Sequence, residues 1–203
     1  MTVQTVSLAA DGLILLTAAV VLGLTFASVV QVARGRRRHA VAPAAGAAVV
    51  LVVYAAVLLG TGLVSRPQQL AIGDAKCFDD WCAALQAADY DASAGTWLVD
   101  VQLQNRGRGR SMRSDLARAY LDVPHRGQVA PLDGSALQTV LQPAERVDVR
   151  LAFLAPGPAQ GVRFVVVEGS GGFGPGTLEI GGEGAPFHAR AGWPLATAAS
   201  AGR

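Results

Sequence analysis

The stretch Cys77-Phe-Asp-Asp-Trp-Cys82 divides this 203-residue chain into two parts of different character. The residues before it contain two long apolar runs, and the residues after it contain short segments in which apolar and polar side chains alternate. Long apolar runs are typical of helices that cross a membrane, whereas alternation is typical of strands with one buried face. We therefore expect two transmembrane α-helices followed by an all-β domain, with the cysteine pair at the entrance of that domain.

The two apolar runs, residues 12–33 and 40–64, contain no Asp, Glu, Lys, Arg or His. At about 1.5 Å per residue, each run is long enough to cross a hydrocarbon core of about 30 Å. Two buried helices of a soluble protein are the alternative, which charge-free segments of this length disfavour. A cleaved signal peptide would begin with basic residues, but residues 1–11 hold one acid and no Lys or Arg. Because ionisable residues inside spans usually mark ion paths, we expect neither a channel nor a transporter.

The connection between the runs, residues 34–39, sets the expected orientation. Short basic loops remain on the cytoplasmic side of a membrane. Residues 1–11 and the whole chain after residue 64 are then extracytoplasmic, as in a two-pass protein of the cell membrane. The four basic residues that carry this argument are Arg34, Arg36, Arg37 and Arg38.

The remaining charges nearly cancel. Apart from the four loop arginines and Asp11, the chain carries 13 basic and 14 acidic side chains, so its net charge of +2 belongs to the membrane loop. This balance gives no indication of nucleic-acid binding. The strong preference for Arg over Lys is typical of GC-rich bacterial genomes.

A polar connection, residues 65–70, leads to a domain that we place at residues 71–195, followed by a flexible tail over 196–203. Strand-like segments in this domain are separated by Gly, Pro, Asn and Asp, which favour turns. About seven short strands in such a length predict a two-sheet sandwich. The glycine-dense stretch 169–176 is interpreted as a hairpin loop. The clearest predicted strands are 82–88, 96–105, 116–123, 147–153, 162–168 and 177–180.

Two of these strands indicate which side chains form the core. Alternate positions of a strand point to opposite faces of its sheet, and in both strands one set is apolar and the other mostly polar. The expected core positions are Trp97, Val99, Val101 and Leu103 in the first strand and Val147, Val149, Leu151 and Phe153 in the second.

The order of four motifs resembles a family of bacterial cell-surface domains of unknown function. The motifs are CFDDWC (77–82), WLVDVQLQNRGR (97–108), LQPAERVDVRLAFLAP (141–156) and LEIGGEGAPFHARAGWPL (178–195). That family is similar to the secreted immunoglobulin-like antigens of mycobacteria. The resemblance covers residues 72–195 and implies an immunoglobulin-like sandwich outside the cytoplasm. It supplies no catalytic residues.

Cys77 and Cys82 are the only cysteines, and they lie on the expected outer side, where disulfides persist. A disulfide between them would close a small loop and stabilise the domain by about 2–3 kcal/mol. A metal or redox site that uses the two thiolates with Asp79 or Asp80 is the alternative, and two unpaired thiols are a third. The four-residue spacing differs from the C-x-x-C of thioredoxins. We expect the two acids to bond to backbone N–H groups of the turn and Trp81 to pack against the sandwich.

Five arginines follow the clearest strand between residues 106 and 118. A solvated loop is the plainer interpretation, and contact with anionic lipid headgroups or an acidic partner is the functional one, since each arginine near an anionic surface adds about 1 kcal/mol. The loop lacks interleaved aromatic residues, which argues against single-stranded nucleic acid. The candidate binding residues of the domain are Arg106, Arg108, Arg110, Arg113, Asp79, Asp80 and Trp81.

The sequence contains no G-x-S-x-G, H-E-x-x-H or Walker motif, and His125 and His188 stand alone in loop-like contexts. We therefore expect neither an enzyme nor a bound cofactor. The leading interpretation is a membrane-anchored binding or accessory module of the bacterial envelope, whose partner is another envelope protein or an anionic surface. The alternative is an envelope metal-handling or redox factor that uses the Cys77–Cys82 loop.

Overall fold

The computed structural model describes residues 2–4, 8–155, 161–169, 178, 180, 183 and 185–195. The chain forms two compact units and passes between them four times. The sheet unit comprises Met1–Thr5, Pro67–Gly172 and Arg190–Arg203, and the helical unit comprises Val6–Arg66 and Phe173–Ala189. The predicted tail and most of the predicted 169–176 loop lie outside the described residues.

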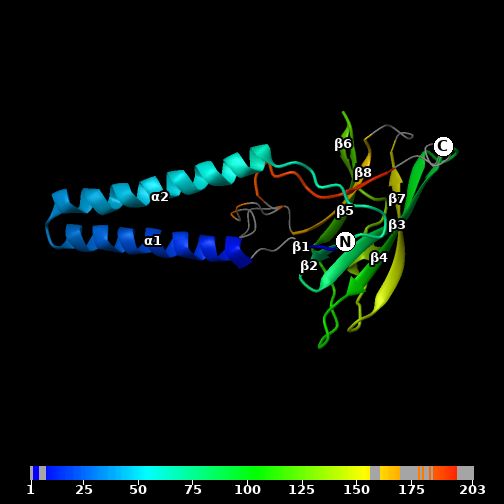
Figure 1. The fold of residues 1–203 in the computed structure, drawn as a ribbon, viewed down its shortest axis with the longest axis horizontal. Helices are drawn as coiled ribbons and strands as arrows, with labels where there is room; N and C mark the ends of the chain where they lie inside the picture. The colour runs from blue at the N-terminus through cyan, green and yellow to red at the C-terminus, as the bar shows by residue number, and fades with distance from the viewer. Residues whose placement is uncertain are drawn as a thin grey trace. The chain divides into compact units, whose positions relative to one another are not determined.

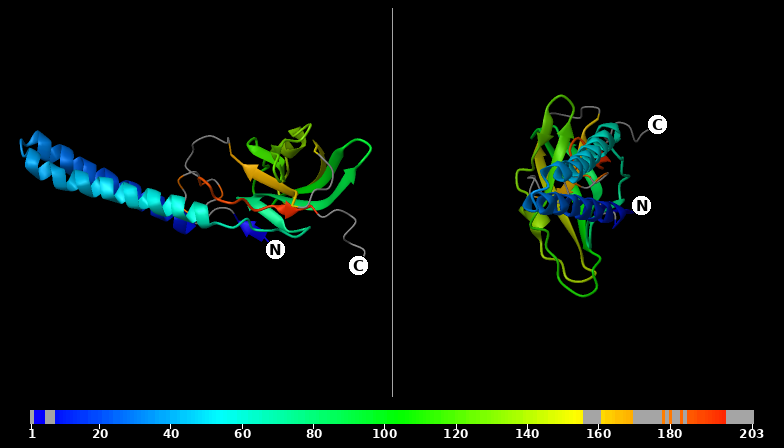
Figure 2. Two further views of the ribbon diagram at one scale, coloured as in Figure 1. Left: turned by 90° about the horizontal axis from the view of Figure 1, so that it is seen from above. Right: turned by 90° about the vertical axis from the view of Figure 1, so that its left-hand side faces the viewer.

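The helical unit contains the two long apolar helices that the sequence predicts, α1 (Leu8–Ala33) and α2 (Arg37–Val64). They lie side by side and antiparallel (Figure 1), joined by a turn in which Gly35 has a φ of +72°. Both are long and apolar enough to cross a membrane. Because α2 begins at Arg37, Pro43 lies inside the helix rather than near its first turn. The views in Figure 2 show the same pairing of the two helices.

Few side chains of the helical hairpin are buried, and the exposed ones are mostly apolar. Leu15, Leu22 and Phe26 are each about 70% exposed. Between the helices, the Ser28 hydroxyl donates a hydrogen bond of 3.0 Å to the carbonyl of Ala40, and Gly46 lies against Leu24. An apolar surface of this kind is suited to lipid rather than to water.

The sheet unit contains two sheets (Figure 1). All neighbouring strands are antiparallel except β1 and β2, which are parallel. A 3-10 turn, η1 (Ser135–Gln138), precedes β7. The first sheet has the order β1 (Thr2–Gln4), β2 (Ala75–Phe78), β3 (Trp81–Asp91), β4 (Thr96–Asn105), β7 (Arg146–Leu154), and the second has the order β6 (Gly127–Val129), β5 (Ala117–Val123), β8 (Arg163–Glu168), β9 (Trp193–Pro194).

The predicted strand Thr96–Asn105 is confirmed at both ends, and the other predicted strands up to residue 168 are confirmed with shifted bounds. The predicted strand 177–180 is wrong for the two residues of it that are described. Leu178 and Ile180 are not in a strand. Instead, the Leu178 carbonyl accepts a hydrogen bond from the Tyr54 hydroxyl of α2. This part of the backbone therefore bonds to the helical unit and not to a sheet.

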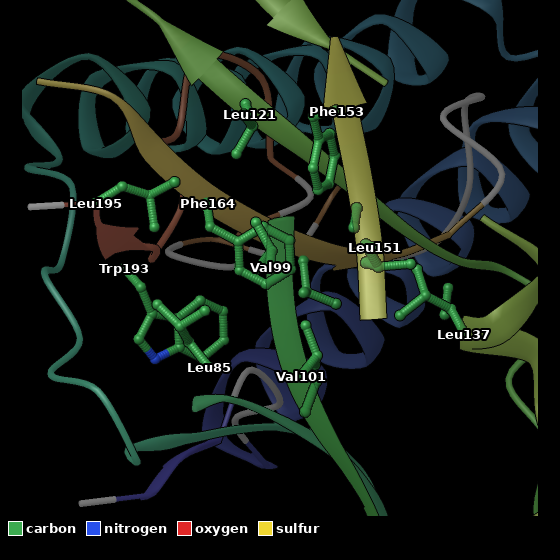
Figure 3. Packing of buried hydrophobic residues seen from close by; sticks show 14 of the residues in the cluster. Leu85, Val99, Val101, Leu121, Leu137, Leu151, Phe153, Phe164, Trp193 and Leu195 are labelled. Atoms are coloured by element: carbon green, nitrogen blue, oxygen red, sulfur yellow. The ribbon is translucent and has the colours of Figure 1, made fainter. Parts of the chain in front are cut away.

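The core forms between the facing sides of the two sheets, as Figure 3 shows. All four apolar positions predicted in β4 are at most 1% exposed. Leu151 and Phe153 of β7 are also fully buried, whereas Val147 and Val149 are only partly buried at the core's margin. Phe153 meets Phe164 of the second sheet edge-on, with ring centroids 6.0 Å apart. Side chains from both sheets therefore interdigitate, as in a sandwich.

Lys76 is the one lysine of the chain, and it is completely buried in β2. Its Nζ donates hydrogen bonds to the carbonyls of Val166 in β8, at 2.8 Å, and Ala191, at 3.2 Å. It also lies 5.3 Å from the centre of the Phe78 ring. A buried ammonium group is tolerated only when hydrogen-bonded, so these contacts link the first sheet to the second at a defined position.

Phe153 and Leu154 are neighbours in β7, but they are 0% and 60% exposed. Substituting each of them tests which face of the first sheet is buried. We expect Phe153→Ala to lower the free energy of unfolding by about 3–5 kcal/mol, since it opens a cavity in the core. Leu154→Ala should cost less than about 0.5 kcal/mol. All three tryptophans, Trp81, Trp97 and Trp193, are buried in the sheet unit, so their fluorescence during denaturant titration measures this unit alone. Equal losses for the two variants would show that the faces are reversed.

Candidate binding surface

The predicted disulfide is confirmed: Cys77 and Cys82 are bonded to each other. They lie directly opposite each other in the β2–β3 hairpin, with their Cα atoms 4.0 Å apart. The hairpin turn between them contains Asp79, whose φ of +58° is in the left-handed region that Asp tolerates better than most residues. Because both sulfurs are joined, neither is a free thiolate that could bind a metal ion in this state.

Trp81 does not belong to a binding surface, so its place among the candidate binding residues was wrong. It is 1% exposed and packs in the core beside Phe78, with ring centroids 5.9 Å apart. The strand alternation accounts for this position, since Cys82, next to it in β3, points to the opposite face.

The structure brings the cysteine hairpin and the arginine loop together. The backbone N–H of Arg106 donates a hydrogen bond of 2.7 Å to the carbonyl of Asp80. Gly107 follows in a tight space, where an added Cβ would lie 3.0 Å from a carboxylate oxygen of Asp80. Two candidate regions that are separated in the sequence therefore form one end of the first sheet.

Asn105, the last residue of β4, is fully buried and fixes the arginine loop. Its side-chain nitrogen donates to the carbonyls of Arg110, at 3.0 Å, and Leu141, at 3.2 Å. Its side-chain oxygen accepts a hydrogen bond of 2.8 Å from the N–H of Gly107. A buried side-chain amide whose oxygen and nitrogen are both hydrogen-bonded to the backbone holds the loop in one conformation. The sequence offered a signal for this role, an Asn at the end of a strand and before Arg-Gly.

The side chains of Arg106, Arg108 and Arg110 are exposed. Arg113 is also exposed, and its Nε lies 2.5 Å from a carboxylate oxygen of Asp115. All four guanidinium groups are therefore presented at the surface of the loop, and Asp115 offsets the charge of Arg113.

Polar side chains on the outward face of β4 and β7 extend this region. The guanidinium of Arg150 donates two hydrogen bonds, of 2.6 and 2.9 Å, to the carboxylate of Asp100. The same hydrogen bonds lower the pKa of Asp100 from its usual value of 3.8. The pair therefore stabilises the fold at neutral pH, and this contribution disappears as the pH falls below 3.8 and through the lowered pKa. Because the pair lies on an exposed face, solvent screens it and its contribution is small.

A hollow of about 170 Å³ lies on the outward face beside the disulfide. Arg106 reaches it from the loop and Arg146 from β7, while Gln102 and Gln104 contribute amide groups from β4. Two guanidinium groups with adjacent amides are suited to bind a carboxylate, sulfate or phosphate group. We call Arg106, Arg108, Arg110, Arg146, Gln102 and Gln104 the arginine surface.

Sequence reasoning missed Arg146 and the two glutamines. They occupy the alternate positions of the strands whose other positions identified the core, and Gln104 lies directly opposite Arg146 in the register. Only the pairing of β4 with β7 places these residues beside the arginine loop, and the sequence does not show that pairing.

Histidines and metal ligands do not extend the site. His125 lies in the β5–β6 turn, and the Nδ1 of His188 is 3.0 Å from the carbonyl of Ala189. Within the part of the chain that the structure describes, no three His, Cys, Asp or Glu residues are grouped to hold a metal ion.

No protein-family model, curated protein or solved structure matches this chain. Three of the sequence motifs contribute residues to the site: Cys77–Cys82 the hairpin, 97–108 the strand and loop, and 141–156 the strand with Arg146.

The disulfide predicts that the isolated protein contains no free thiol. Alkylation of the unfolded, unreduced chain should modify no cysteine, and the same treatment after reduction should modify two. Replacing both cysteines by Ser should lower the free energy of unfolding by only about 2 kcal/mol, because the bridge closes a short loop. Free thiols in freshly prepared membranes would contradict this assignment.

Proposed function

We propose that this protein is a two-pass membrane protein of the bacterial cell envelope whose extracytoplasmic immunoglobulin-like domain binds an acidic partner through the arginine surface. The partner is another envelope protein or an anionic surface, and the domain has no catalytic role. The observation that carries this proposal is the position of the arginine surface on a rigid sheet that two membrane-length helices anchor.

The pairing of β1 with β2 supports an even number of membrane crossings. β1 precedes α1 and β2 follows α2, yet the two strands are neighbours in one sheet. Both ends of the helical hairpin must therefore be on the same side of any membrane that it crosses. The basic turn Arg34–Arg38 is then on the other side, which the positive-inside rule identifies as the cytoplasm.

The strand order supports an immunoglobulin-like topology. In that fold, strands A, B, E and D form one sheet and strands C, F and G the other, with C′ added beside C in some domains. Among the described residues, the orders β3-β4-β7 and β6-β5-β8-β9 agree with this arrangement except that strand D has no counterpart, with β3 as A, β4 as B and β7 as E. In this comparison β1 and β2 are additions at the outer side of strand A.

Charge and rigidity support a binding role. The exposed arginines project from a loop that a buried amide fixes, so little side-chain and loop ordering is needed when a partner binds. Guanidinium groups bind carboxylates and phosphates in a bidentate geometry. The envelope offers both, as acidic protein surfaces and as anionic lipids or polymers.

Reporter fusions test the orientation. A phosphatase that is active only outside the cytoplasm should be active when fused after Arg203 and inactive when inserted at Gly35. The charges of the loop cause this orientation, so neutralising its four arginines should produce mixed topology. The opposite pattern at the two sites would refute the proposed location.

Cross-linking in intact cells tests the binding role. A photo-reactive residue at position 108 should form an adduct with a partner, and Arg106→Gln with Arg146→Gln should weaken binding about thirtyfold and reduce the adduct yield accordingly, since each arginine contributes about 1 kcal/mol. Arg118→Gln with Arg126→Gln is the charge-matched control, because both lie exposed on or beside the second sheet. An adduct yield that falls equally in both double variants would indicate a general charge effect and contradict a specific surface.

A further inference from the structure

The hollow beside the disulfide forms where two rows of outward-facing residues cross the first sheet. Directly opposite residues of antiparallel strands have their Cβ atoms about 5 Å apart, so the side chains of one row are neighbours. In both rows the side chains are short on β2 and β3 and longer on β4 and β7, and this difference in length leaves space above β2 and β3. Read from β2 to β7, the rows are Ala75, Ala84, Gln102, Asp148 and Cys77, Cys82, Gln104, Arg146.

The floor of the hollow consists of small residues without charge. Gly73, Ala75 and Ala84 line it, together with the disulfide-bonded Cys82. A methyl group fits such a floor, whereas a hydrated inorganic ion would lose water there without receiving hydrogen bonds from the side chains. The volume of about 170 Å³ equals that of about six water molecules at about 30 Å³ each, which is enough for one small residue.

The wall of the hollow supplies hydrogen-bond donors and an acceptor. Arg106 and Arg146 contribute guanidinium groups, and Arg146 has no acidic partner among the described residues. Gln102 donates a hydrogen bond of 3.1 Å from Nε2 to the carboxylate of Asp148. Because a carboxylate only accepts, the amide nitrogen faces it, and this leaves Oε1 of Gln102 as an acceptor. A ligand that suits this wall has an anionic group with an N–H close to it.

Asp148 limits the negative charge that the hollow accommodates. It lies two residues from Arg146 on the same face of β7, and its carboxylate is hydrogen-bonded to an amide and not to a guanidinium. The charges of Arg106, Arg146 and Asp148 sum to +1. This sum matches a carboxylate better than a phosphate monoester, which carries a charge of about −1.5 to −2 at pH 7.

We propose that the hollow binds the carboxy-terminal residue of a partner polypeptide, an inference that deepens the proposed function and rests on it. The guanidinium groups of Arg106 and Arg146 hold the terminal carboxylate. Oε1 of Gln102 accepts a hydrogen bond from the N–H of the same residue, and its side chain lies on the floor beside Ala75 and Ala84.

The size of the hollow sets the specificity. Only a small terminal side chain, such as that of alanine, glycine or serine, fits the floor. An internal acidic residue would bring the chain on both sides of it into a space that holds one small residue. The acidic partner of the arginine surface is therefore a protein with an accessible carboxy terminus, rather than a lipid headgroup.

Saturation-transfer NMR on the full chain in phosphatidylcholine nanodiscs tests this binding. The probe is N-acetyl-dialanine, and its terminal methyl group should receive saturation from the protein and none from empty nanodiscs. The carboxy-terminal amide of the same peptide should bind about tenfold more weakly, because it lacks the charge that the guanidinium groups recognise. At constant ionic strength, an equal concentration of inorganic phosphate should not displace the peptide.

Two matched pairs of variants locate the site. Arg146→Gln should weaken peptide binding about tenfold, whereas Arg118→Gln, at an exposed position of β5, should leave it unchanged. Ala75→Leu fills part of the floor and should abolish binding. Ala152→Leu is its control, because Ala152 is also half-buried but does not line the hollow. Tryptophan fluorescence during denaturant titration should show that all four variants keep the sheet unit folded.

The outcomes separate this inference from the proposed function. If N-acetyl-dialanine does not bind, or phosphate displaces it, the carboxy-terminal site is refuted. An adduct at position 108 that depends on Arg106 and Arg146 would then still support the proposed function, and the loss of both results would refute both. Equal effects within either pair of variants would also refute the carboxy-terminal site.

Discussion

The pairing of β1 with β2 is the constraint on which the arrangement of the chain depends. Thr2, Val3 and Gln4 lie opposite Ala75, Lys76 and Cys77 in a parallel register. Parallel neighbours require a long crossover, and here the whole helical hairpin is that crossover. The chain that leaves the sheet unit after residue 5 therefore returns to it before β2.

The binding surface depends on the same strands. β2 and β3 form the hairpin that the disulfide closes, and its turn supports the first residue of the arginine loop. On the other side of this sheet, Lys76 bonds to backbone carbonyls of β8 and of the chain before β9. The core on the inner face of the sheet thus fixes the strands that carry the exposed arginines, so that binding requires little rearrangement of the domain.

Much of the fold could be predicted because its signals are local. The apolar runs, the alternation in Thr96–Asn105 and the lone cysteine pair each identify a structure from a few adjacent residues. What could not be predicted depends on distant partners. Three residues are too short for β1 to show a periodicity, and Leu178 has a strand-like pattern, although its carbonyl bonds to Tyr54. Arg146 joined the site only because β7 pairs with β4.

The most direct test of the account is the side of the membrane on which the chain's N-terminus lies. One epitope tag before Met1 and another after Arg203 can be probed with antibody on intact spheroplasts and again after permeabilisation. Because β1 belongs to the sheet unit, both tags should bind antibody before permeabilisation. If one tag binds only after permeabilisation while the other binds before it, β1 and β2 cannot share a sheet, and the account is contradicted.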